Sequence, residues 1–123
     1  MTKYYYRGFN FHNDTERLEA VKIDGLNLRF INNQTETICL EAVKQDGLSL
    51  GYVKEQTPEI CLQAISQDPW ALSYVNEQTE ELCLKAVKKD PEAISFIRDK
   101  EMFDKVAKAL NIDTSKYSFA FFY

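Results

Sequence analysis

Three cysteine thiols stand at intervals of 22 residues, as Cys39, Cys61 and Cys83. Thiols of this kind could form a disulfide, ligate zinc or act as nucleophiles. A disulfide requires Cα atoms about 4.4–6.8 Å apart, whereas neighbouring helices lie about 8–10 Å apart. The close ligand pairs of a zinc site are also missing. We therefore expect buried cysteines that act as small hydrophobic residues in a reducing compartment, with a redox or metal role as the alternative.

The carboxylates that recur at the same interval are the next candidates for chemistry: Asp24, Asp46, Asp68 and Asp90. Each precedes a glycine or a proline, which is typical of a helix start or a turn, so their recurrence has a structural explanation. His12 is the only histidine, and the four glycines form no phosphate-binding loop. We expect no enzymatic activity, no cofactor and no metal site.

Composition points to an ordinary soluble domain of 123 residues, with 45% hydrophobic and 28% charged residues. No apolar run approaches the roughly 20 residues of a membrane-spanning helix, and the N-terminus lacks the apolar region of a signal peptide. A formal charge of −4 argues against nucleic-acid binding, which usually requires a clustered basic surface. We expect a single cytoplasmic domain that binds neither membranes nor nucleic acids.

A period of 22 residues organises most of the chain. Four copies align without gaps, over residues 13–34, 35–56, 57–78 and 79–100. Alanine occupies one position of all four copies, and an aromatic residue occupies another: Phe30, Tyr52, Tyr74 and Phe96. A fixed period in the twenties is typical of stacked supersecondary units.

Each copy is predicted to form two short helices joined by a tight corner. Thr57-Pro58 is typical of an N-cap followed by a proline in the first helical turn, and Asp68-Pro69 repeats that pattern before the second helix. At 100° per residue, the apolar residues of each helix cover about 200° of arc, which suits a helix packed between successive repeats. The sequence predicts an all-α fold, an α-solenoid-like stack of helical hairpins.

The phrase "ICLEAVKQDGLSLGYVKEQT" resembles the short helical repeats of the domain of unknown function 4116, found in bacteria, phages and giant viruses. The resemblance covers Asn13 to about Lys100, and its ICLxAVxxD-[GP]-x-x-L pattern is fairly specific. It implies a stacked helical array, with no assigned activity and no catalytic residues to transfer. The first copy departs from the pattern at Glu16 and Arg17, which suits a terminal, capping repeat.

The two ends of the chain are rich in aromatic residues. Residues 1–12 are predicted to form an aromatic N-terminal cap, residues 101–112 a capping helix, and residues 113–123 an aromatic tail. The tail aromatics are Tyr117, Phe119, Phe121, Phe122 and Tyr123. Either these terminal aromatics fold back to seal the stack, or the tail forms an exposed contact for a partner or a second copy.

Repeat arrays bind through positions that vary between copies, so a binding stripe is expected on the second helices. Its predicted residues are Arg29, Asn32, Gly51, Lys54, Trp70, Ser73, Asn76, Ser95 and Arg98. Trp70 stands where other copies have leucine or glutamate, so it either adds packing or forms a contact hot spot.

We expect a non-catalytic protein-interaction module that presents this stripe to another protein of unknown identity. One alternative is a small phage- or virus-type inhibitor that blocks a host enzyme or defence protein, acting in the host cytoplasm. Another is a structural subunit that self-assembles through its aromatic ends.

Overall fold

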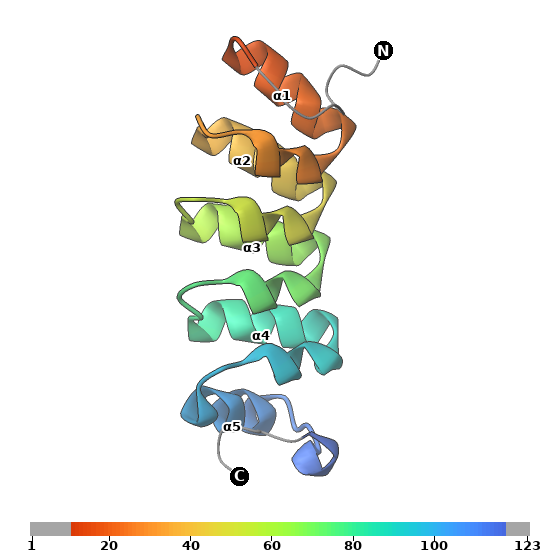
Figure 1. The fold of residues 1–123 in the computed structure, drawn as a ribbon. Helices are drawn as coiled ribbons and strands as arrows, with labels where there is room; N and C mark the ends of the chain where they lie inside the picture. The colour runs from red at the N-terminus through yellow and green to blue at the C-terminus, as the bar shows by residue number, and fades with distance from the viewer. Residues whose placement is uncertain (1–10, 118–123) are drawn as a thin grey trace.

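The computed structural model describes residues 11–117, which form a single ladder of helices (Figure 1). Tyr4, Tyr5, Tyr6, Phe9, Phe119, Phe121, Phe122 and Tyr123, which belong to the predicted terminal segments, lie outside the described residues. The α-helices are α1 (Asp14–Ile23), α2 (Glu36–Gln45), α3 (Pro58–Gln67), α4 (Glu80–Lys89) and α5 (Lys100–Ala109). The 3₁₀-helices are η2 (Gly25–Phe30), η3 (Gly47–Tyr52), η4 (Pro69–Tyr74), η5 (Pro91–Phe96) and η6 (Thr114–Lys116).

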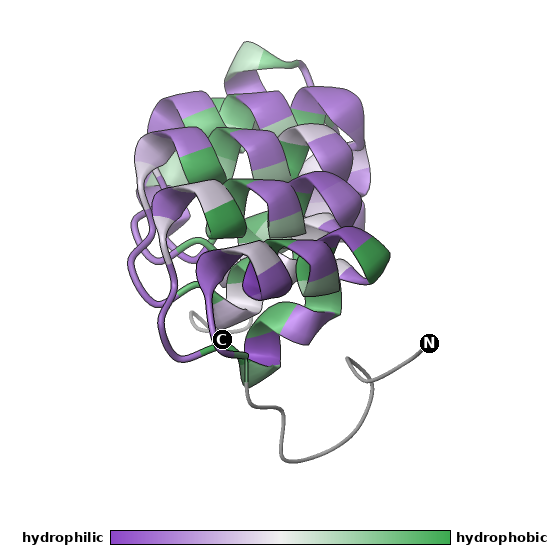
Figure 2. Cartoon of the chain, turned by 90° about the horizontal axis from the view of Figure 1, so that it is seen from above, coloured by the Kyte–Doolittle hydropathy of each residue, from purple (hydrophilic) through white to green (hydrophobic). Residues whose placement is uncertain are grey.

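Each 22-residue unit contributes one α-helix and one 3₁₀-helix, and the units follow one another along the ladder from α1 to α5 (Figure 1). A continuous hydrophobic core runs through the stack, with Leu28, Leu50, Leu72 and Ile94 among its fully buried side chains. Seen along the stack, the loops are mainly hydrophilic, and each helix carries both hydrophilic and hydrophobic residues (Figure 2). The predicted all-α stack of helical hairpins is confirmed.

The α-helices begin at the predicted caps. The Oγ1 atoms of Thr35, Thr57 and Thr79 accept hydrogen bonds from backbone N–H groups three residues ahead, at 3.2–3.3 Å. Each cap satisfies one of the N–H groups that a helix start leaves without an intrahelical partner. Pro58 follows Thr57 in the first turn of α3, where a missing N–H costs nothing.

The second of the two predicted helices in each unit is a 3₁₀-helix, a type that a helical wheel at 100° per residue does not describe. The aspartate caps act as predicted: one carboxylate oxygen of each accepts the N–H two residues ahead, as from Asp68 to Trp70 at 2.9 Å. The six residues of each segment close hydrogen bonds from residue i to i+3, and Val75 N–H donates to Leu72 O at the end of η4. Residues three apart eclipse on a 3₁₀-helix, so Leu72 and Val75 face the core together.

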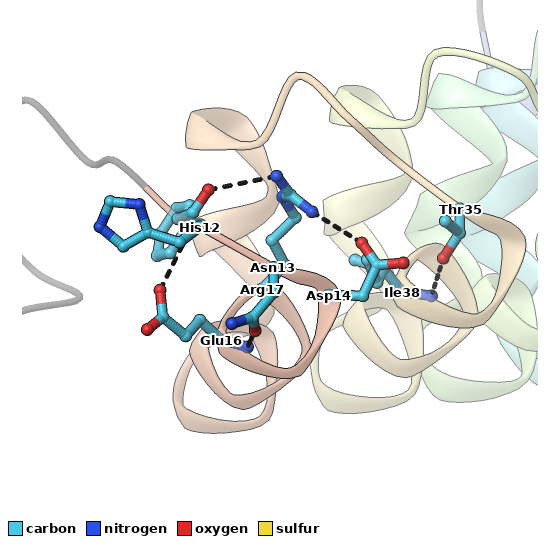
Figure 3. Close-up of polar contacts among 8 residues, drawn as sticks. His12, Asn13, Asp14, Glu16, Arg17, Thr35 and Ile38 are labelled. Carbon is cyan, nitrogen blue, oxygen red and sulfur yellow. Dashed lines mark hydrogen bonds and ion pairs between the residues drawn. The ribbon is translucent and has the colours of Figure 1, made fainter.

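The first unit departs from the pattern because its first turn forms an N-terminal cap (Figure 3). Asn13 Oδ1 accepts the N–H of Glu16 at 2.9 Å, and Glu16 Oε1 accepts the N–H of His12 at 3.0 Å. Arg17 pairs with Asp14 at 2.7 Å and donates to Phe11 O at 3.1 Å. Glu16 and Arg17 therefore tie the entering chain to α1, as the expectation of a capping repeat requires.

The C-terminal unit closes the stack with a more amphipathic helix. Asp99 caps α5 by accepting the N–H of Met102 at 2.9 Å. Phe103, Val106 and Ala107 are buried against the preceding unit. The ion pair of Lys105 with Glu80 at 3.2 Å links α5 to α4 on the outside. The predicted capping helix is present as α5.

Glycines set how closely the first units approach one another. A Cβ atom at Gly25 would lie 2.3 Å from Ala42 O, and one at Gly47 would lie 2.4 Å from Ala64 O. The equivalent positions of the third and fourth units are Pro69 and Pro91, which do carry a Cβ. A Cβ atom does not fit at such a distance from a carbonyl oxygen. The backbone of the fourth unit must therefore lie farther from Pro69 than the backbone of the third unit lies from Gly47. Gly25 and Gly47 are buried accordingly, whereas Pro91 is exposed.

One buried hydroxyl gives a prediction about stability. Ser49 is fully buried, and its Oγ is the one buried side-chain N or O atom among residues 11–117 without a hydrogen-bond partner. The third and fourth units carry Ala71 and Ala93 at this position. We expect Ser49→Ala to raise the free energy of unfolding by about 1 kcal/mol, because it removes an unsatisfied polar group, as measured by urea denaturation.

The matched control for Ser49 is the same position of the first unit. Asn27 is also buried, but its Nδ2 donates to Ala20 O at 2.9 Å. Asn27→Ala should therefore lower the free energy of unfolding, since the Ala20 carbonyl loses one of its two donors and a cavity forms. A Ser49→Ala variant that is less stable than the parent would show that the hydroxyl contributes a bond.

Candidate interaction surface

The 3₁₀-helices carry an exposed aromatic surface, here called the aromatic face and defined by five side chains: Phe30, Tyr52, Trp70, Tyr74 and Phe96. Trp70 is 50% exposed, Tyr74 46% and Tyr52 43%, while Phe30 and Phe96 are half-buried. Four of the five occupy one repeat position, so the stacking of the units aligns them. Large aromatics that stay half-exposed on a rigid scaffold are typical of contact surfaces.

Trp70 lies across the junction between the third and fourth units. Its indole Nε1 donates to Asp90 Oδ2 at 3.0 Å, and its ring meets that of Phe96 edge-on, with centroids 5.4 Å apart. These contacts hold the indole in one orientation while half of its surface remains open. Trp70 thus packs between two units and stays half-exposed, while its role as a contact hot spot stays a prediction.

The cations of the predicted stripe hold neighbouring units together. Lys54 Nζ donates to the backbone O of Asn32 at 3.2 Å, one unit back. The Arg98 guanidinium donates to Asn76 O at 3.2 Å, to Ser73 O at 3.4 Å and to Val75 O. Each cation therefore satisfies loop carbonyl groups of the preceding unit, and Arg98 does so with several donors.

The small residues of that stripe are engaged as well. Ser73 Oγ and Ser95 Oγ each donate to the backbone O three residues earlier, at 2.9 Å. A Cβ at Gly51 would lie 3.0 Å from the Tyr74 ring, so this aromatic side chain lies over the glycine. Arg29 lies over the ring of Phe30, 4.7 Å from its centroid. The nine predicted residues thus lie on or beside the 3₁₀-helices, and their place in partner binding stays a prediction.

A row of glutamine amides connects the units, and sequence reasoning missed it. Gln34, Gln56 and Gln78 end the first three units, and Lys100 ends the fourth. Each glutamine Nε2 donates to a backbone O 18 residues ahead at 2.8–2.9 Å. Each Oε1 accepts a backbone N–H 20 residues ahead at 3.0 Å. The recurrence of glutamine at the last repeat position was the signal that could have revealed these bridges.

Two equivalent grooves open beside the α-helix starts. The groove between the third and fourth units has a volume of about 560 Å³ and is lined by Pro58, Leu62 and Leu82, with Glu77 and Glu81. The groove one unit earlier measures about 360 Å³ and contains Lys54 with Glu36 and Glu55. Glu36 and Glu81 lie in the first turns of α2 and α4, where a negative charge interacts favourably with the helix dipole. This interaction gives the two glutamates a structural role.

The three cysteines are buried and free, as the sequence predicted. Burial, with Glu36 nearby, raises the pKa of Cys39 to about 11. Burial likewise raises the pKa of Cys61, and it raises the pKa of Cys83 to about 11 although Arg98 acts in the opposite direction. Thiols with such pKa values stay protonated near neutral pH and are weak nucleophiles.

Residues 11–117 contain no group of three or more His, Cys, Asp or Glu side chains arranged to hold a metal ion. Over the same range, no helix combines the length and the apolar character needed to cross a membrane.

The start of the predicted aromatic tail folds back on the stack. Tyr117 is half-buried and packs against the core, and its hydroxyl donates to Glu92 Oε2 at 3.2 Å. Lys116 lies over the Tyr117 ring, 5.4 Å from its centroid. Phe119, Phe121, Phe122 and Tyr123 lie outside the described residues.

The stacked 22-residue unit defines the protein as a helical-repeat protein of short α/3₁₀ hairpins. The model of the family described as "Domain of unknown function (DUF4116)" matches three overlapping stretches, residues 17–57, 35–79 and 57–103. Together they cover most of the chain, which therefore belongs to this repeat family. Neither a curated protein nor a solved structure shows significant similarity to it.

Proposed function

We propose that the chain is a non-catalytic protein-interaction module that binds a partner protein through its aromatic face. The observation that supports this most is the half-exposed group Tyr52, Trp70 and Tyr74 on successive 3₁₀-helices. Tyrosine and tryptophan bury a large area at low cost in side-chain entropy, and they are enriched among interface hot spots. A stack braced by glutamine amides presents them without rearrangement.

The chemistry of the surrounding residues favours binding over catalysis. The thiols are buried with raised pKa values, and the recurring aspartates are engaged as helix caps. The polar groups beside the aromatic face, among them Ser73, Ser95 and Arg98, bond to backbone carbonyl groups. Tyr52, Trp70 and Tyr74 remain about half-exposed and can meet another molecule.

A capture experiment with matched variants tests this proposal. Immobilised protein is exposed to a lysate of the source organism, and bound proteins are quantified by mass spectrometry. We expect the double variant Tyr52→Ala/Tyr74→Ala to retain a specific partner at about one tenth of the parent level or less, since hot-spot losses typically exceed 1.4 kcal/mol. The control is Ile23→Ala, which truncates an apolar side chain of similar exposure, 49%, outside the aromatic face.

Thermal unfolding of each variant shows whether the stack stays intact. A partner that binds the double variant as well as the parent would refute the aromatic face as the binding site. The partner also distinguishes the alternatives. An enzyme or defence protein whose activity falls upon binding would identify an inhibitor, whereas capture of the chain itself would identify a self-assembling subunit.

A further inference from the structure

The two grooves beside the α-helix starts are formed by the same repeat positions, and they differ at the position that carries a lysine in the first. The smaller one, here called the Lys54 groove, is lined by Lys54, whose Nζ donates to Asn32 O at 3.2 Å and to Asn32 Oδ1 at 3.4 Å. The larger one, here called the Asn76 groove, has Asn76 at that position. The chain thus supplies a cation to the first groove, and a neutral amide at the same position of the second.

The fourth unit carries a cation at this repeat position again. Arg98 stands 22 residues after Asn76, and its guanidinium donates to Asn76 O at 3.2 Å. Lys54 and Arg98 therefore make the same contact, each with a backbone carbonyl group 22 residues earlier. For position 76 the corresponding carbonyl group is that of Lys54, and within residues 11–117 it accepts no hydrogen bond. The third unit therefore differs from the second and the fourth in lacking a donor for this acceptor.

The Asn76 groove also presents carboxylates without a cation. Glu77 and Glu81 line it and are exposed, and neither belongs to an ion pair of residues 11–117. Within that same range, no lysine, arginine or histidine lines this groove. The half-buried Leu62 and the buried Leu82 provide apolar surface beside the carboxylates. Such a surface suits a side chain with an alkyl stem and a cationic head, as in lysine and arginine.

The helix dipoles at this groove do not exclude a cation. The starts of α3 and α4 border the Asn76 groove, and helix N-termini carry partial positive charge. The Lys54 groove borders the starts of α2 and α3 in the same way, yet the ammonium group of Lys54 lies there against a carbonyl oxygen. The carbonyl acceptor therefore outweighs the dipoles at this place in the stack.

We propose that the Asn76 groove binds a lysine or arginine side chain of a partner polypeptide. The bound cation pairs with Glu77 and Glu81 and donates to Lys54 O, and so takes the place of the cation that the second and fourth units supply themselves. Its alkyl stem and a neighbouring aliphatic residue pack on Leu62 and Leu82. This site is separate from the aromatic face, and it does not rest on the proposed function.

A peptide titration followed by NMR tests the site directly. The probe is a capped isoleucine–arginine–glycine tripeptide, which reproduces the order of Ile97 and Arg98, and the full chain is labelled with ¹⁵N. We expect saturable shifts of the Glu77 and Glu81 amide signals. The same peptide with glutamine in place of arginine should bind at least fivefold more weakly, because it keeps the stem but loses the charge-assisted hydrogen bonds.

Paired charge variants separate the groove from general charge attraction. Glu77→Gln/Glu81→Gln should lower the affinity for the arginine peptide about fivefold, through loss of two exposed ion pairs. Glu36→Gln/Glu55→Gln removes the same two charges at the Lys54 groove, and it should change the affinity less than twofold. An equal loss in both double variants would overturn the proposal.

Asn76→Lys gives the third unit a cation of its own and is the sharpest variant. Lysine occupies this position in the second unit, so the stack should stay intact, as thermal unfolding would show. We expect the affinity for the peptide to fall at least tenfold, because the new ammonium group competes for Lys54 O and repels the peptide's cation. Unchanged binding to this variant would mean that the peptide does not use the groove.

The remaining outcomes also decide the proposal. The absence of saturable shifts at Glu77 and Glu81 up to about 10 mM peptide would contradict it, and so would shifts confined to Tyr52 and Tyr74, which would place the peptide on the aromatic face. Shifts at the groove that depend on protein concentration without peptide would identify a second copy as the occupant instead. Since the titration contains no partner protein, its failure leaves the aromatic-face proposal to the capture experiment with Tyr52→Ala/Tyr74→Ala.

Discussion

Gly47→Ala is expected to lower the free energy of unfolding by about 3 kcal/mol, at the upper end of the range for overpacking. The added Cβ would lie 2.4 Å from Ala64 O and 3.0 Å from Gln67 Oε1, and the first of these neighbours is backbone. The carbonyl cannot turn away, because it accepts the Asp68 N–H at 2.8 Å where α3 ends. The only relief is for the second and third units to move apart, which strains their packing along the whole contact.

Backbone conformation plays no part in this prediction. Gly47 does not have a positive φ, so alanine could adopt its backbone angles. A Gly→Ala change in an unstrained helix would by itself stabilise the protein. The expected loss therefore measures the close approach of two units, and Gly25→Ala, with its Cβ 2.3 Å from Ala42 O, should cost a similar amount.

Gly51→Ala is the matched control, because it makes the same chemical change in the same 3₁₀-helix. Its Cβ would meet the ring of Tyr74 at 3.0 Å, but that ring is 46% exposed and can shift. Serine occupies this position in the next two units. We expect a change within about 0.5 kcal/mol, measured by urea denaturation beside Gly47→Ala. Equal stability of the two variants would show that the units do not need the close approach at Gly47.

The repeat architecture was predictable because a single sequence period determines both the local and the long-range structure. Thr57 and Asp68 mark helix starts within one unit, and the same residue types recur 22 positions away. Stacking then follows, since helices of ten and six residues are too short to be stable alone. The capping helix was predictable for the same reason, from the narrower apolar stripe around Phe103 and Val106.

The type of the second helix was harder to predict, although a signal existed. Gly47, Leu50 and Val53 are buried at intervals of three residues, which is the period of a 3₁₀-helix and not of an α-helix. Because glycine is not counted as an apolar residue on a helical wheel, the interval of three residues was not apparent from the sequence. The wheel at 100° per residue instead placed Trp70 and Tyr74 on the buried arc, and both are half-exposed.

The contacts of the candidate interaction surface could be predicted only in part, because periodicity identifies positions but not hydrogen bonds between units. The predicted stripe lies on or beside the 3₁₀-helices and includes Trp70; its place in partner binding stays a prediction. However, Lys54 and Arg98 looked like free donors, since a sequence does not show that the preceding unit places carbonyl groups within their reach. The exposed tyrosines, by contrast, recur at one repeat position, and recurrence alone does not separate a core position from an aligned surface.

Gln78→Leu is expected to lower the free energy of unfolding by about 3 kcal/mol, through loss of three hydrogen bonds between and within units. The Nε2 of Gln78 donates to Leu72 O at 3.0 Å and to Phe96 O at 2.9 Å, and its Oε1 accepts the Arg98 N–H at 3.0 Å. Leucine has a similar volume, so the loss arises from the missing hydrogen bonds and not from a cavity, although Leu72 O keeps the Val75 N–H. Two of the three bonds are partly buried, so water replaces them poorly.

Amide hydrogen exchange distinguishes this cause from general loosening of the stack. The Arg98 N–H should lose its protection in Gln78→Leu, whereas the Asn76 N–H, held by Gln56 Oε1 at 3.0 Å, should keep it. Gln45→Leu serves as the stability control, because Gln45 is exposed and its amide donates only to the Glu41 carboxylate on the same helix. Its free energy of unfolding should stay within about 0.5 kcal/mol of the parent. If the two leucine variants are equally stable, the glutamine bridges do not hold the units together, and the rigidity that we assign to the aromatic face must come from the apolar core alone.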